Sequence, residues 1–133
     1  MNTLFNHRTK GFTIIELLIV ILILSILVAL AYPSYTQYAR KAKRGEAQQL
    51  LMNWSVNQEI WRSNNPSYDD GTNLPAPEND YYALSVSGTS ATTYLLTATA
   101  EGGQVKDKAK NGDICSPLTL DQNGVKLPAA CWD

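Results

Sequence analysis

Polar and apolar residues divide the chain into an apolar N-terminal stretch and a mixed remainder. From Phe12 to Tyr32 the only clearly polar residues are Thr13, Glu16 and Ser25, and no charged residue follows Glu16 until position 40. A run of about 20 apolar residues can cross a bilayer as a helix. We predict a membrane-spanning helix here and not a buried core helix, because a chain of 133 residues has too little other apolar sequence to surround one.

The pattern becomes one-sided after Pro33. Apolar residues recur at the offsets of a helix face, whereas charged residues fill the other side. The members of this face are Ala47, Leu50, Leu51, Trp54 and Trp61. We predict one helix from Thr13 to about Arg62, with a bend near Pro33, because proline removes a backbone hydrogen bond and clashes with the preceding turn.

Strand-like alternation dominates the C-terminal half. Two segments alternate apolar and polar residues, and a third surrounds an Asn123-Gly124 pair, which is a strong hairpin signal. The apolar positions are Tyr82, Leu84 and Val86, then Tyr94, Leu96, Ala98 and Ala100, then Leu118, Leu120, Val125 and Leu127. These signals predict an α+β fold, in which a three- or four-stranded antiparallel sheet packs its apolar face on the helix half after Pro33.

Two polar segments, 63–80 and 101–113, are predicted to be solvated surface loops. The first contains four acids that raise the question of calcium, but their spacing does not fit an EF-hand loop. The second alternates lysines at positions 106, 108 and 110, which could touch DNA or a partner. We favour solvated loops in both cases.

The two cysteines, Cys115 and Cys131, flank the predicted terminal hairpin. Outside the cytoplasm they are expected to form a disulfide. A metal site is disfavoured because two distant cysteines without histidine cannot complete a tetrahedral shell. In chain-entropy terms, a disulfide that closes the loop between positions 115 and 131 stabilises the fold by about 3 kcal/mol.

The charged residues and the lack of catalytic motifs limit the classes of function that this sequence can have. The chain has 11 basic and 12 acidic residues and a formal net charge of −1, which gives no sign of a polyanion-binding protein. The basic cluster 40–44 could meet anionic lipid heads or DNA, but we favour solvated charge on a helix. The single histidine, His7, precedes the apolar run, and the sequence has no phosphate-binding glycine loop. We expect no enzyme activity, cofactor or metal.

The first ten residues indicate the topology. They include Arg8 and Lys10 and no acid, so this end is expected to remain in the cytoplasm. A secretory signal has its small-residue cleavage site after the apolar run, whereas the small residue that stands out here is Gly11, before it. Cleavage there would leave the apolar segment on the mature protein.

The stretch "KGFTIIELLIVILILSILVALAYPSYTQY" resembles the N-terminus of type IV pilins and pseudopilins, with its class III leader. The match consists of Gly11, Phe12, Thr13, two apolar residues, Glu16 and a long apolar run at fixed spacing. The end of the chain, "CSPLTLDQNGVKLPAACW", resembles a PilE-type minor pilin of type IVa pili.

The resemblance implies processing and assembly. A prepilin peptidase would cut between Gly11 and Phe12 and N-methylate Phe12. Residues 1–11 would be the leader, 12–33 the membrane and filament-core helix, and 34–133 a periplasmic or extracellular globular domain with the pilin fold. An isolated carboxylate is costly in lipid, so Glu16 is expected to pair with the new amine of Phe12, in its own chain or a neighbour's, and to set the register of subunits.

The implied function is that of a structural, minor subunit of a type IV pilus, which supports assembly, twitching motility and adhesion. The implied partners are other pilin subunits, in a homo- or heteropolymer, the prepilin peptidase and an inner-membrane assembly platform. Binding of nucleic acid is possible but not indicated. The subunit would be single-pass in the inner membrane and then enter an extracellular pilus. Two alternatives stay open: a type II secretion pseudopilin, against which the cysteine pair counts, and a DNA-binding competence pilin. Many pilins have a glycine where this chain has Ser25, so unwinding of 25–33 is not settled.

Overall fold

The structure is a computed structural model that describes residues 11–132. It consists of two compact units, Met1–Thr36 and Gln37–Asp133. The predicted leader lies outside the described residues except for Gly11.

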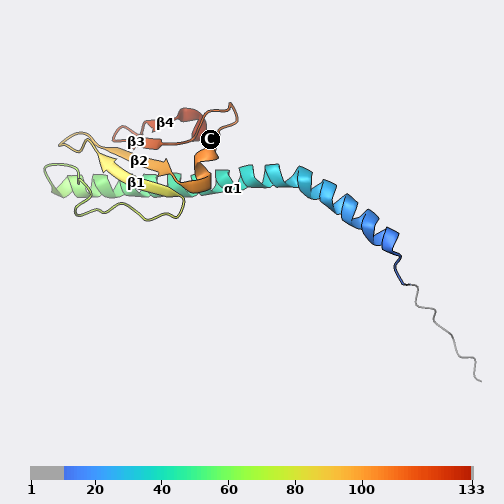
Figure 1. The fold of residues 1–133 in the computed structure, drawn as a ribbon. Helices are drawn as coiled ribbons and strands as arrows, with labels where there is room; N and C mark the ends of the chain where they lie inside the picture. The colour runs from blue at the N-terminus through green and yellow to red at the C-terminus, as the bar shows by residue number, and fades with distance from the viewer. Residues whose placement is uncertain (1–10, 133) are drawn as a thin grey trace, which may run out of the picture. The chain divides into compact units, whose positions relative to one another are not determined.

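One helix, α1 (Ile14–Asn64, 51 residues), begins one residue later and ends two residues later than predicted (Figure 1). Thr13 precedes it and accepts a hydrogen bond on Oγ1 from the backbone N–H of Glu16, at 3.2 Å, as an N-cap residue does. At its other end, Asn65 donates from Nδ2 to the carbonyl of Trp61, and Pro66, which lacks an N–H, follows. Both ends of α1 are thus defined by side chains next to it in sequence.

Four antiparallel strands form the sheet, in the spatial order β1-β2-β3-β4. They are β1 (Tyr82–Ser87), β2 (Leu95–Ala100), β3 (Leu118–Asp121) and β4 (Lys126–Leu127). Two 3₁₀ helices, η1 (Gly102–Lys106) and η2 (Ala129–Cys131), complete the elements. In Figure 1 the strands lie along the second half of α1, so the predicted α+β arrangement is confirmed.

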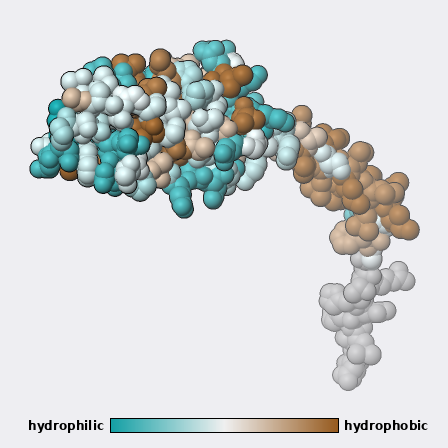
Figure 2. All heavy atoms as spheres, turned by 60° about the vertical axis from the view of Figure 1, so that its left-hand side comes forward, coloured by the Kyte–Doolittle hydropathy of each residue, from teal (hydrophilic) through white to brown (hydrophobic). Residues whose placement is uncertain are grey.

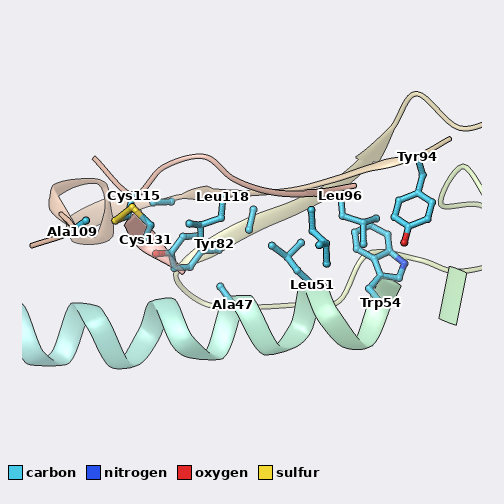
Figure 3. Packing of buried hydrophobic residues seen from close by; sticks show 13 residues of the cluster. Ala47, Leu51, Trp54, Tyr82, Tyr94, Leu96, Ala109, Cys115, Leu118 and Cys131 are labelled. Atoms are coloured by element: carbon cyan, nitrogen blue, oxygen red, sulfur yellow. A yellow bond between two sulfur atoms is a disulfide. The ribbon is translucent and has the colours of Figure 1, made fainter. Parts of the chain in front are cut away.

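The core lies between the sheet and α1. Figure 3 shows Leu51 and Trp54 from α1 pointing toward Tyr82 and Leu96, and the exposed fraction of each of these side chains is 2% or less. The strand alternation that predicted Tyr82, Leu84 and Val86 on one face of β1 matches its burial pattern. Truncation of a core leucine such as Leu51 to alanine costs about 2–5 kcal/mol.

The terminal hairpin has the predicted Asn-Gly turn. Gly124 adopts a φ of 76°, which a residue with a side chain rarely does. The Asp121 carboxylate accepts hydrogen bonds from the N–H groups of Asn123 and Val125, each at 2.8 Å. The turn is therefore specified by both the glycine and the aspartate.

Cys115 and Cys131 form the predicted disulfide, which joins the segment before β3 to η2. Both residues are fully buried within the hydrophobic core (Figure 3). The disulfide thus fixes both ends of the hairpin to the body of unit Gln37–Asp133.

The prediction of two solvated loops was wrong in part. In 101–113, η1 interrupts the loop, and Gln104, Asp107 and Ala109 are buried. In 63–80, Asp69 is only 4% exposed. Both loops contain buried polar side chains whose hydrogen bonds are made to residues distant in sequence or to the backbone amides of the loop itself. A prediction from composition does not detect such contacts.

Candidate functional site

The first candidate surface is the apolar part of α1. Each large apolar side chain from Phe12 to Tyr32 is between 47% and 80% exposed. Figure 2 shows this segment as a nearly continuous hydrophobic surface. By length and composition, α1 is apolar enough to cross a membrane. An exposed apolar surface of this extent marks a contact with lipid or with another protein.

Two residues lie in front of α1, where processing is predicted. Gly11 and Phe12 precede the helix and are exposed, Phe12 by 79%. A Cβ atom added to Gly11 would meet no heavy atom within 4 Å. The described fold therefore places no steric demand for glycine at position 11, so any such demand comes from a partner that handles this segment.

Glu16 lies in the first turn of α1 with its side chain exposed. Its backbone N–H is the one that Thr13 caps, so Thr13 and Glu16 occupy the first and last positions of a capping-box sequence, T-x-x-E. A carboxylate here also interacts favourably with the helix dipole. This local role was not predicted, although the T-x-x-E spacing that indicates it is present in the sequence.

Two hydroxyl groups in and beside the apolar segment are satisfied within the helix. Ser25 Oγ donates to the carbonyl of Ile21 at 2.7 Å, and Thr36 Oγ1 donates to the carbonyl of Pro33 at 2.9 Å. Such back-bonding allows a hydroxyl to be placed in an apolar environment without an orphaned donor. Pro33 lies within the bounds of α1, and the bend expected there stays a prediction.

A second surface lies on α1 within unit Gln37–Asp133, on the side away from the core. Exposed residues without charge recur there at spacings of four and three, the period of a helix-packing seam. We call this set the outer row: Tyr38, Ala42, Gly45, Gln49, Met52, Val56 and Ile60. Val56 and Ile60 are 58% and 60% exposed, and a Cβ at Gly45 would meet only open space.

The basic cluster 40–44 is not uniformly solvated, which corrects the prediction. Arg44 is 5% exposed and its Nη1 forms a 2.7 Å ion pair with Asp107, itself 3% exposed. The same Nη1 lies 3.1 Å from the disulfide sulfur of Cys115. Lys43 lies over the ring of Tyr81, with Nζ 3.7 Å from the ring centroid, in a cation–π contact.

These contacts bring two basic segments together. Gln104 Nε2 donates to the carbonyl of Arg40 and to the hydroxyl of Tyr82, which fixes η1 beside α1. The exposed lysines of the two segments, Lys41, Lys106, Lys108 and Lys110, therefore belong to one region of the unit. In the sequence these lysines belong to two separate segments, so their proximity was not predicted.

A family model for "Type IV minor pilin ComP, DNA uptake sequence receptor" matches residues 33–119, and a model of the prokaryotic N-terminal methylation motif matches residues 6–32. The chain belongs to the type IV pilins. A curated relative, the type IV major pilin protein PilE1 of Neisseria gonorrhoeae, is 33% identical over an alignment that covers 95% of this chain and 58% of that protein. The pilin described here thus spans about 58% of that relative's length.

A solved structure supports the same assignment. A type IV pilin from Shewanella oneidensis matches with a TM-score of 0.57 and 29% identity, over 71% of this chain and 98% of that one. The pilin fold expected from the N-terminal resemblance is therefore confirmed, with its long helix, four-stranded sheet and C-terminal disulfide.

Proposed function

We propose that this pilin is a structural, minor subunit of a type IV pilus that polymerises through its N-terminal helix. The observation that carries the proposal is the exposed apolar surface of α1 directly behind the methylation motif. Lipid and a filament core are both apolar, so one surface serves the membrane-anchored precursor and the assembled subunit. The subunit would contribute to assembly, twitching motility and adhesion, which are general roles of pili.

Processing is part of the proposal. A prepilin peptidase cuts between Gly11 and Phe12 and methylates the new amine of Phe12. The exposure of both residues and the open space around Gly11 support this assignment. Cleavage leaves Thr13 in place, so the cap of α1 is retained in the mature chain.

Glu16 is proposed to set the register of subunits by pairing with the amine of Phe12 on a neighbour. Its exposure supports this, because its own chain supplies it with no ion pair among the described residues. A charge in lipid costs at least about 2.5 kcal/mol, so a partner cation favours transfer of the subunit into the filament.

The proposed route places residues 12–33 in the inner membrane and 34–133 outside it, until an assembly platform draws the subunit into the pilus. Mass spectrometry of filaments sheared from cells tests this. We expect the chain to begin at methylated Phe12 and to be two hydrogens light for Cys115–Cys131. Its absence from sheared pili would overturn the subunit assignment, and its abundance relative to other pilins distinguishes a minor from a major subunit.

The outer row is proposed to pack against a helix of the neighbouring subunit. Its spacing of four and three residues suits helix–helix packing, and Ala42 and Gly45 permit close approach. Replacing Val56 with glutamate should reduce incorporation into filaments, whereas Asn57→Glu, an exposed neighbour off the row, should not. Equal incorporation of both variants would contradict this role.

A competence pilin that binds DNA is the second candidate, favoured by the ComP model match and by the lysines gathered around η1. It predicts that the pilin binds duplex DNA, with an affinity that falls steeply with salt. Replacing Lys106, Lys108 and Lys110 with glutamine should weaken binding and flatten the salt dependence. Fluorescence anisotropy that shows no binding at low salt would dismiss this candidate.

The remaining alternative is a pseudopilin, which would have the same fold but act in type II secretion instead of in a pilus. Deletion of the gene followed by an assay of secreted hydrolases separates the two. A secretion defect in cells with normal pili would favour the pseudopilin over the pilus subunit.

A further inference from the structure

A shallow pocket of about 270 Å³ opens in unit Gln37–Asp133, and the proposed pilus function does not use it. It lies where the end of α1, the following loop and the β1–β2 connection meet. The residues that matter for its chemistry are Trp61 and Asn65 from α1 and its end, Asp70 and Asn73 from the loop, and Thr89 from the β1–β2 connection.

The loop wall of this pocket is held in one conformation by buried polar contacts. The Asp69 carboxylate accepts hydrogen bonds from the backbone N–H groups of Gly71, Asn73 and Leu74. The side chain of Gln58 bonds both the N–H and the carbonyl of Asp69, at 2.9 and 3.0 Å. A site of this kind is preformed, which lowers the entropic cost of binding.

The same contacts shape the polarity of the pocket, because they engage one of the two N–H donors of each side-chain amide and leave the amide oxygen open. Asn65 Nδ2 donates to the carbonyl of Trp61, and Asn73 Nδ2 donates to Asp69, both at 2.8 Å. Thr72 donates its N–H and its hydroxyl to Oδ1 of Asp70. The remaining oxygens, Oδ1 of Asn65, Oδ1 of Asn73 and Oδ2 of Asp70, are acceptors that a ligand with several donors could use.

The lining also disfavours other ligand classes. Among the described residues that form the pocket there is no lysine or arginine, so a phosphate or carboxylate ligand would meet no cation. The buried Asp69 is already saturated, which leaves only one carboxylate, too few for a calcium shell of six to eight oxygens.

We propose that this pocket binds a single neutral sugar ring of a glycan. Sugar hydroxyls donate to the three oxygens, while the half-exposed ring of Trp61 offers an apolar surface to the C–H face of the sugar. The volume is below the range of about 300–1,000 Å³ for drug-sized ligands, which fits one ring rather than an oligosaccharide. The pilin would then carry a weak lectin site in its globular domain.

The test uses the full chain in a detergent without a sugar head group. Saturation-transfer NMR is recorded with the methyl glycosides of galactose, glucose, mannose and N-acetylglucosamine. At least one glycoside should bind with a dissociation constant in the millimolar range. Asp70→Asn should weaken that binding roughly tenfold, because a hydrogen bond from a hydroxyl to a charged oxygen is lost, and Trp61→Leu should weaken it as well.

Asp80→Asn is the matched control, since Asp80 is an exposed carboxylate of the same loop region that does not line the pocket. It should leave glycoside binding unchanged. The proposal is overturned if none of the four glycosides binds, or if Asp70→Asn and Trp61→Leu bind as the parent does. The Asp70→Asn chain should still be present in sheared filaments in normal amounts. This measurement distinguishes a loss of sugar binding from a loss of the proposed subunit function.

Discussion

Removing the carboxylate of Asp107 should destabilise the globular unit far more than removing any exposed charge near it. The 2.7 Å ion pair with Arg44 is almost fully buried, so Asp107→Ala leaves a guanidinium without its counter-charge in the core. Breaking a buried pair in this way costs about 3–5 kcal/mol, a large part of the roughly 5–15 kcal/mol that holds a typical domain together.

Urea unfolding of the full chain in detergent, followed by tryptophan fluorescence, measures the effect. Trp54 is 2% exposed in the core, so its fluorescence changes when unfolding exposes the indole ring to solvent. With a denaturant slope of about 2 kcal/mol per molar urea, the midpoint should fall by about 2 M. Lys108→Ala, an exposed change one residue along, should move the free energy of unfolding by no more than about 0.5 kcal/mol.

A double variant separates the charge from the packing. Arg44→Met with Asp107→Leu removes both partners and keeps apolar volume, so it should recover most of the stability that Asp107→Ala loses. The reasoning is refuted if Asp107→Ala shifts the midpoint no further than Lys108→Ala does. That result would mean that Arg44 is effectively solvated when its partner is removed.

Three further outcomes are expected. Replacing Cys115 and Cys131 together with serine should lower the free energy of unfolding by about 3 kcal/mol, measured by the same urea titration; no change would show that the crosslink does not constrain the unfolded chain. Burial alone would raise the pKa of Asp69, but hydrogen bonds from Asn73 and from the backbone of Leu74 and Gly71 lower this pKa below its ordinary 3.8. The stability that the ionised Asp69 contributes is therefore present above pH 3.8 and is lost as the pH falls through the folded pKa. Acid titration of stability should therefore show a steeper loss below about pH 4 in the parent than in Asp69→Asn. Glu16→Gln keeps the helix cap and removes the charge, so immunoblots of sheared pili should show reduced incorporation with normal cleavage, and normal incorporation would assign Glu16 to capping alone.

Local signals in the sequence were sufficient for α1 and the strands of this fold, but not for the short helices η1 and η2. The apolar run and the one-sided face after Pro33 predicted α1 to within two residues at each end. Alternation predicted β1 and β2, and Asn123-Gly124 predicted the hairpin, because periodicity and turn chemistry are properties of neighbouring residues.

The sequence did not predict the polar contacts that join distant segments. Arg44 and Asp107 are 63 residues apart, and each looks like an ordinary surface charge among others. Gln58 lies at helical spacing from Leu51 and Trp54, on the predicted apolar face, but nothing in the sequence identifies Asp69 as its partner. Pairing of this kind depends on tertiary structure, so neither composition nor periodicity reveals it, and the pocket beside Trp61 was missed for the same reason.

The shortness of β4 affects the tendency of this protein to aggregate through the edge of its sheet. A precursor held at high local density risks joining its neighbours through unpaired strand edges, which is a common route to irreversible aggregation. Here that edge of the sheet is two residues long, carries Lys126, and is followed at once by Pro128, which has no N–H to offer. A foreign strand would find almost no ladder to extend there, so copies of this chain at high concentration are protected at this edge from joining into a disordered β-aggregate.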